Sequence, residues 1–171
     1  MDHDAYDDAW IAGLLRAVRT IAVIGASANP VRPSFFVTKY LVAKGYTVWP
    51  VNPGRAGGEI ADLPAYGSLA DCPDVPDMVD VFRRVEALPG IVEEIEALPR
   101  PPKVVWLQLG IRDDAVAARL EEHGIAVVQD RCPKIEYARL SGEIGWTGYN
   151  RRTISARRPI LSKGFQHYGL D

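Results

Sequence analysis

Five short, continuous apolar runs recur along this chain, and segments with helical spacing of apolar residues separate them. The runs occupy residues 20–25, 46–51, 78–82, 104–109 and 125–129. Such runs are typical of strands buried on both faces, as in a parallel sheet. Strands that alternate with helices predict helices on both faces of the sheet and right-handed crossovers. We therefore predict an α/β fold: a single Rossmann-like three-layer domain with a five-stranded parallel sheet in the order 3-2-1-4-5.

The predicted helices span residues 8–18, 35–44, 88–98, 113–123 and 133–140. Ser34 can cap the second helix. Gly45 and Gly124 follow the second and fourth helices at the position where a left-handed residue often ends a helix. Pro133 suits the first turn of the last helix. We expect residues 57–74, beginning at the Gly57-Gly58 pair, to form a loop.

The chain length of 171 residues fits one ordinary domain. We divide it into an N-terminal helix that packs on the domain (1–19), the Rossmann-like domain (20–142) and a basic C-terminal extension (143–171). The extension can attract an anionic partner or simply lie on the domain as a solubilising segment. Its cationic residues, with no acidic residue among them, are Arg151, Arg152, Arg157, Arg158 and Lys163.

The composition excludes several classes of protein. Hydrophobic residues make up 47% and charged residues 25%, so the chain is not a disordered polymer. No apolar run approaches the roughly 20 residues of a membrane helix. The start is acidic where a secretory signal would be basic. Cys72 and Cys132 match neither a disulfide framework nor a zinc site. We expect a cytoplasmic protein with no membrane attachment and no metal.

A ligand site is expected where the first strand ends, because open α/β sheets bind ligands beyond the carboxyl ends of their strands. Here that place is the segment 25–34. Gly25 allows a sharp turn, and the small residues after it let a phosphate approach the backbone. The helix that follows Ser34 favours an anion at its N-terminus. Arg32 adds a positive charge with a geometry suited to phosphate.

Two common nucleotide motifs are missing. The dinucleotide fingerprint needs three glycines and an acidic residue after the second strand, whereas this chain has only Gly25 and the sequence Val51-Asn52-Pro53. The GxxxxGK[ST] phosphate loop is also absent. These absences disfavour a nicotinamide dehydrogenase. Arg83 and Arg84 follow the third strand, and Arg55 follows the Asn52-Pro53 turn. This combination suits a ligand with several phosphates.

In these segments the sequence resembles the small stand-alone CoA-binding protein family, Rossmann-fold relatives of the CoA-binding domain of succinyl-CoA synthetase. The resemblance covers roughly residues 20–140. The matching stretches are IGAS (24–27), PVRPS (30–34), GYTVWPVNP (45–53), DVFRR (80–84), VWLQLG (105–110) and DRCPKIE (130–136).

The resemblance implies that coenzyme A binds at the carboxyl edge of the sheet. It assigns the phosphates to the glycine–serine turn and Arg32, the adenosine side to residues 51–53, and closure over the nucleotide to Phe82 and Arg83. The expected binding residues are Gly25, Ala26, Ser27, Ala28, Asn29, Pro30, Arg32, Ser34, Val51, Asn52, Pro53, Phe82, Arg83, Arg84 and Gly110.

No catalytic constellation is evident, and the second domain with a phosphorylated histidine that the synthetases need is not recognisable. We therefore predict non-catalytic binding of coenzyme A or an acyl-CoA. One alternative is an acyl-transfer or thiol–disulfide enzyme that uses Cys132, whose pKa Arg131 and Lys134 could lower. Another is an interaction module that uses the basic tail, with a protein favoured over nucleic acid because aromatic nucleic-acid motifs are absent. A homodimer is left open.

Overall fold

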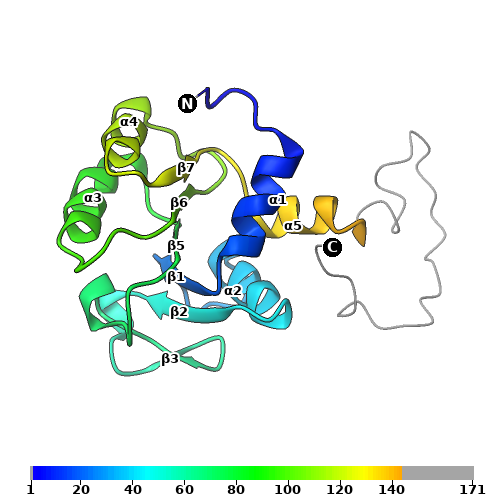
Figure 1. Cartoon of the computed structure of the whole chain (residues 1–171). Coiled ribbons are helices and arrows are strands. Elements are labelled where there is room, and N and C mark those ends of the chain that lie inside the picture. Colours follow the sequence, from blue (N-terminus) through cyan, green and yellow to red (C-terminus); the bar gives the residue numbers. More distant parts are fainter. Residues whose placement is uncertain (1, 144–171) are drawn as a thin grey trace.

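The computed structural model describes residues 2–143. Its main element is a five-stranded parallel sheet (Figure 1), and each expected apolar run forms one of its strands. The strands are β1 (Thr20–Ile24), β2 (Thr47–Val51), β5 (Met78–Val81), β6 (Val104–Leu107) and β7 (Ala126–Val128). The α/β class and the parallel sheet are therefore confirmed.

The predicted strand order is wrong. The sheet runs β2-β1-β5-β6-β7, which is 2-1-3-4-5 rather than 3-2-1-4-5. The third strand, β5, pairs with β1 and not with β2. Pro50 gives the physical reason, because a proline cannot donate a ladder hydrogen bond and belongs on an edge strand. Its carbonyl accepts from the Tyr66 N–H, whereas the next carbonyl, of Val51, accepts from Gly25 at the end of β1.

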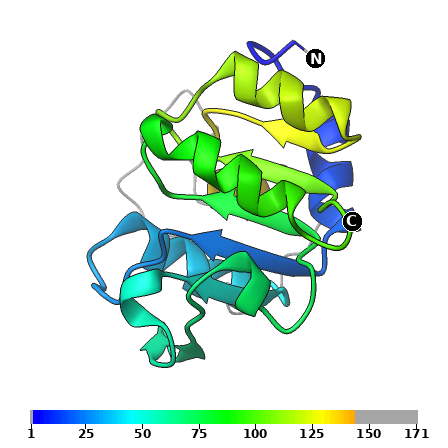
Figure 2. The same ribbon diagram turned by 90° about the vertical axis from the view of Figure 1, so that its left-hand side faces the viewer.

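Helices cover both faces of the sheet, as predicted. α1 (Asp8–Ala17), α2 (Pro33–Ala43) and α5 (Pro133–Leu140) lie on one face, and α3 (Leu88–Glu96) and α4 (Asp114–Glu122) on the other (Figures 1 and 2). Each face buries its own apolar cluster. The five predicted helices are confirmed to within two residues at each end. Ser34, however, is not the cap of α2: Arg32 occupies that position, and Ser34 lies within the first turn.

The connection between β2 and β5 contains more structure than the expected loop. It holds the 3-10 turns η1 (Pro53–Arg55) and η2 (Leu69–Asp71) and a small antiparallel hairpin of β3 (Glu59–Ile60) and β4 (Leu63–Pro64). A third such turn, η3 (Val85–Ala87), precedes α3. Ile60 of the hairpin is buried in the cluster that contains α2. The connection thereby covers the outer edge of β2.

Both ends of the described segment pack on the sheet domain. In α1, Ile11 and Leu15 are buried in the same cluster as β1. Glu143 is buried, and its carboxylate accepts a hydrogen bond of 2.9 Å from the Tyr40 hydroxyl. The cations expected in the basic extension lie outside the described residues. Within residues 2–143, every helix is too short or too polar to cross a membrane.

Candidate functional site

A cavity of ≈ 900 Å³ opens at the carboxyl ends of β1, β5 and β6, beside the N-terminal ends of α2 and α5. This is the switch point of the observed strand order, between β1 and β5. The predicted site residues that line it are Gly25, Ser27, Arg32, Ser34, Phe82, Arg83, Arg84, Gly110 and Cys132. The other lining residues were not among the expected binding residues, although Lys134 was named beside Cys132: Pro33, Phe36, Val37, Val85, Glu86, Gln108, Leu109, Ile111, Lys134 and Ile135.

Seven of the predicted binding residues do not line this cavity. They are Ala26, Ala28, Asn29, Pro30, Val51, Asn52 and Pro53. Ala26 and Val51 are buried in the core. The structure therefore brings together the cationic part of the predicted site and leaves the predicted adenosine side, at the end of β2, outside the cavity.

Gly25 joins β1 to the site through a turn that only glycine accommodates. Its φ of +80° lies in the left-handed region. A Cβ atom built on it would lie 2.8 Å from the Phe82 carbonyl oxygen and 2.9 Å from Cδ of Arg83. The turn after β1 is therefore in direct contact with the turn after β5, and the stem of Arg83 lies against the glycine.

Serine hydroxyls shape the turn that follows Gly25. The Ser27 N–H donates to Oγ of Ser34 at 3.1 Å, and the Asn29 N–H donates to Oγ of Ser27 at 3.1 Å. These two backbone amides are thus used within the turn and do not face a ligand. Each hydroxyl accepts one of these bonds and donates to none of the described residues.

The arginines of the cavity differ from several other arginines of the described segment, although Arg19 and Arg55 are likewise exposed and without an ion pair to a described residue. Arg32, Arg83 and Arg84 are exposed, and none forms an ion pair with a described residue. In contrast, Arg112, Arg119 and Arg139 each pair with carboxylates. Cations outnumber carboxylates in the cavity lining, where Lys134 joins the three arginines and Glu86 is the one acidic residue among the described lining groups. The cavity is therefore electropositive.

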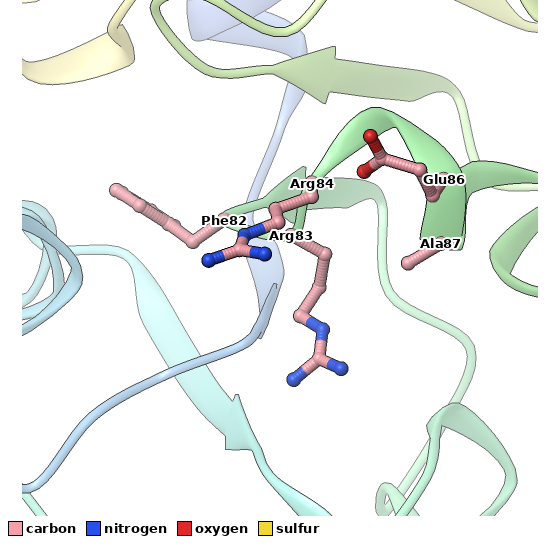
Figure 3. A pocket seen from close by; sticks show the side chains of 5 residues that line it. All are labelled: Phe82, Arg83, Arg84, Glu86 and Ala87. Carbon is pink, nitrogen blue, oxygen red and sulfur yellow. The ribbon is translucent and has the colours of Figure 1, made fainter.

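A smaller cavity of ≈ 600 Å³ adjoins the first at the end of β5 and shares Phe82, Arg83, Arg84 and Glu86 with it. Figure 3 shows the side chains of Phe82, Arg83 and Arg84 diverging from the segment after β5, whereas Glu86 lies on the turn η3. Phe82 and Arg84 extend toward one side and Arg83 toward another. The Glu86 carboxylate points away from both guanidinium groups, which leaves them available to an anion.

Asn52 holds the site turn in place from β2. Its Nδ2 donates to the Ala26 carbonyl at 2.7 Å, and its Oδ1 accepts from the Gly54 N–H at 2.9 Å. Both ends of the amide are used inside the protein. The geometry supports a positioning role for Asn52 rather than the expected contact with adenosine.

Replacing Asn52 by Ala is expected to lower the free energy of unfolding by about 1–3 kcal/mol, because two hydrogen bonds are lost. Urea unfolding measures this change. Asn29→Ala is the control, since the exposed Asn29 side chain accepts only from the Val31 N–H and its loss should be smaller. An Asn52→Ala protein that keeps wild-type stability and loses only ligand affinity would instead make Asn52 a ligand contact.

A buried carboxyl lies beneath the cavity. Asp80, on β5, is fully buried, and Nε2 of Gln108 donates to both of its oxygens, at 2.9 and 3.1 Å. Burial raises the pKa of Asp80 to about 8, and the Gln108 hydrogen bonds oppose this shift only in part. Gln108 in turn lines the cavity. The sequence signal for this pair is an aspartate inside the otherwise apolar run 78–82.

Cys132 lines the cavity as the residue that precedes α5. The expected lowering of its pKa is wrong. Burial raises the pKa of this thiol, and Asp80 adds to the increase, whereas Lys134 and the N–H groups of Ile135 and Lys134 oppose it more weakly. Burial also raises the pKa of Cys72, to about 12. The thiol of Cys132 is therefore protonated near neutral pH, which weakens it as a nucleophile.

Fold and site together define an α/β domain with an electropositive cavity at the carboxyl edge of a parallel sheet. Residues 19–138 match the CoA binding domain family, and the chain belongs to that family. The resemblance drawn from the sequence is thereby confirmed.

Relatives of known sequence or structure agree with this assignment. The uncharacterised protein YneT of Bacillus subtilis is 37% identical over 130 residues, which cover 76% of this chain and 93% of YneT. The solved structure of cell-free ID.343 from Thermus thermophilus has a TM-score of 0.72 and 42% identity, covering 77% of this chain and 96% of that one. Acetate–CoA ligase [ADP-forming] I subunit alpha of Pyrococcus furiosus is 34% identical over 82 residues, 44% of this chain and 17% of the subunit.

Proposed function

We propose that this protein binds coenzyme A or an acyl-CoA in the cavity and performs no chemistry on it. The observation that carries this proposal is the group of unpaired arginines, Arg32, Arg83 and Arg84, around the cavity. Coenzyme A carries a pyrophosphate and a 3′-phosphate, and such groups favour the planar fork of arginine. Membership of the CoA binding domain family supports the same ligand.

In this proposal the phosphates contact Arg32 and the hydroxyls of Ser27 and Ser34, while Phe82 and Arg83 close over the nucleotide. Gly25 and Asn52 act through the backbone, because one permits the turn and the other holds it. The ionisable groups of the cavity support the part of the proposal that excludes chemistry. The Cys132 thiol has a raised pKa, Asp80 is covered by Gln108, and none of the described lining residues is a histidine.

Calorimetric titration with coenzyme A, dephospho-CoA and NAD tests the proposal. We expect coenzyme A to bind most tightly and Arg32→Ala to weaken it about 10-fold or more, because a hydrogen bond to a charged group contributes about 1.5–3 kcal/mol. Arg55→Ala is the matched control, since Arg55 is an exposed arginine on η1 that does not line the cavity. Equal affinities in the two variants, or binding of NAD in preference to coenzyme A, would refute the proposed site.

A further inference from the structure

The exposed apolar side chains of this protein are concentrated at the cavity. Five large apolar residues of the described segment are strongly exposed, and three of them, Phe36 (51%), Leu109 (57%) and Ile135 (45%), line the cavity. The other two are Val31 (74%) and Val42 (41%). A single exposed apolar residue is ordinary, whereas several that meet at one cavity mark a binding surface.

These three side chains come from different elements. Phe36 lies on α2, Ile135 on α5 and Leu109 in the segment after β6, and α2 and α5 cover the same face of the sheet (Figure 1). Their neighbours in the cavity lining include Val37, Val85 and Ile111. One cavity thus joins an apolar surface to the cations that the proposed function assigns to phosphates.

We propose that this apolar surface, formed by Phe36, Leu109 and Ile135, binds the acyl chain of an acyl-CoA, so that the protein prefers acylated to free coenzyme A. The inference rests on the proposed function and names its ligand class. NAD or inorganic phosphate would satisfy the arginines and leave these side chains in water. A ligand with a polyanionic end and an apolar end satisfies both parts of the cavity.

The dimensions agree with this assignment. Parallel strands lie about 4.8 Å apart, so the ends of β1 and β6, with β5 between them, are separated by about 10 Å. The pantetheine arm of coenzyme A is about as long as four peptide residues and spans roughly 13–14 Å when extended. With its phosphates at the turn after β1, the ligand can therefore place its thioester beside Leu109.

Charge argues against a second copy of the chain as the occupant. A symmetric dimer through this surface would bring Arg32, Arg83 and Arg84 of one copy toward the same residues of the other. Like charges across an interface are unfavourable. An acyl-CoA brings negative charge to the cations and an apolar chain to the apolar surface.

Calorimetric titration with free coenzyme A and with its acetyl, butanoyl, hexanoyl and octanoyl thioesters tests the inference. We expect affinity to rise about fourfold for each methylene that becomes fully buried. The readout is the ratio of octanoyl-CoA to free coenzyme A affinity in each variant, so a general loss of affinity cancels. Phe36→Ala and Ile135→Ala should reduce this ratio at least several-fold. Val42→Ala should leave it unchanged, because the exposed Val42 lies on α2 away from the cavity.

The outcomes separate the inference from the proposed function. Binding of free coenzyme A with a flat chain-length series would overturn the inference and leave the proposed function standing. An unchanged ratio in the Phe36→Ala, Ile135→Ala double variant would overturn it as well. Failure of every CoA species to bind would remove the proposed function itself. Sedimentation velocity identifies the rival occupant: a wild-type dimer that Phe36→Ala dissociates, with a flat series, would make this surface an interface between copies.

Discussion

The wild-type protein is expected to lose about 3–4 kcal/mol of folding stability between pH 5 and pH 8 through Asp80, and replacing Asp80 by Asn should remove this loss. The fully buried Asp80 carboxyl has a pKa of about 8 in the folded protein. Its pKa in the unfolded chain is about 3.9. Between these values the folded state holds a proton that the unfolded state has lost. Stability from this group is therefore complete below about pH 4 and declines as the pH rises toward 8.

Asparagine suits the test because it has nearly the shape of aspartate and carries no charge. Its carbonyl oxygen still accepts from Nε2 of Gln108. Urea unfolding of both proteins at pH 5, 6, 7 and 8 measures the effect, and the difference between the two curves cancels the titration of every other group. We expect the free energy of unfolding of Asp80→Asn, relative to that of the wild type, to rise at each step toward pH 8.

Asp77→Asn is the matched control. Partial burial would raise the pKa of this carboxylate, but its pairing with Lys103 and the hydrogen bonds from the N–H groups of Arg19 and Thr20 outweigh that effect and hold the pKa below the usual range. Its contribution to stability is therefore complete above about pH 5. Asp77→Asn should lose stability by a constant amount from pH 5 to pH 8. Parallel curves for wild type and Asp80→Asn would show that Asp80 is ionised throughout this range.

The strands and helices were predictable because burial imposes a pattern that each short segment carries by itself. Strand order is different, since it depends on which segments pair. Pro50 indicates the position of its strand, because a strand with a proline in its middle belongs at the edge of a sheet. In the order 3-2-1-4-5 the strand containing Pro50 would have had neighbours on both sides. The observed order places it at the edge, and only the connection through Tyr66 covers it.

The candidate site was predictable where the cavity is lined by residues of the segments that follow β1 and β5. Gly25, Arg32, Phe82 and Arg83 follow β1 or β5, and the carboxyl ends of parallel strands share one edge. The apolar part was not predictable, because Phe36 in an apolar helix looks like a core residue. Its exposure depends on how α2 packs against the rest of the domain, which the sequence pattern does not show.

Gly25→Ala is expected to lower the free energy of unfolding by about 2–5 kcal/mol and to weaken binding of coenzyme A. Two costs add. An L-residue in the left-handed region costs about 1–2 kcal/mol, and forcing an extra methyl group into a packed site costs about 1–3 kcal/mol. The second cost cannot be relieved by a side-chain rotation, because the atom 2.8 Å away is the backbone oxygen of Phe82, which moves only with β5. Urea unfolding and calorimetric titration measure the two effects.

Gly45→Ala separates these costs. Gly45 also has a positive φ, +90°, but a Cβ atom there would meet nothing within 4 Å. Gly45→Ala should therefore lower the free energy of unfolding only by the cost of an L-residue at positive φ. Because Gly45 follows α2 and does not line the cavity, the variant should leave the affinity for coenzyme A unchanged. The difference between the two variants isolates the contact between the turns after β1 and β5. Because that contact fixes Phe82 and Arg83 beside the turn after β1, where the proposed function places the phosphates, Gly25→Ala should weaken coenzyme A binding even under conditions where the protein is fully folded. Equal stability losses in the two variants, with affinity preserved in both, would show that this contact does not organise the site.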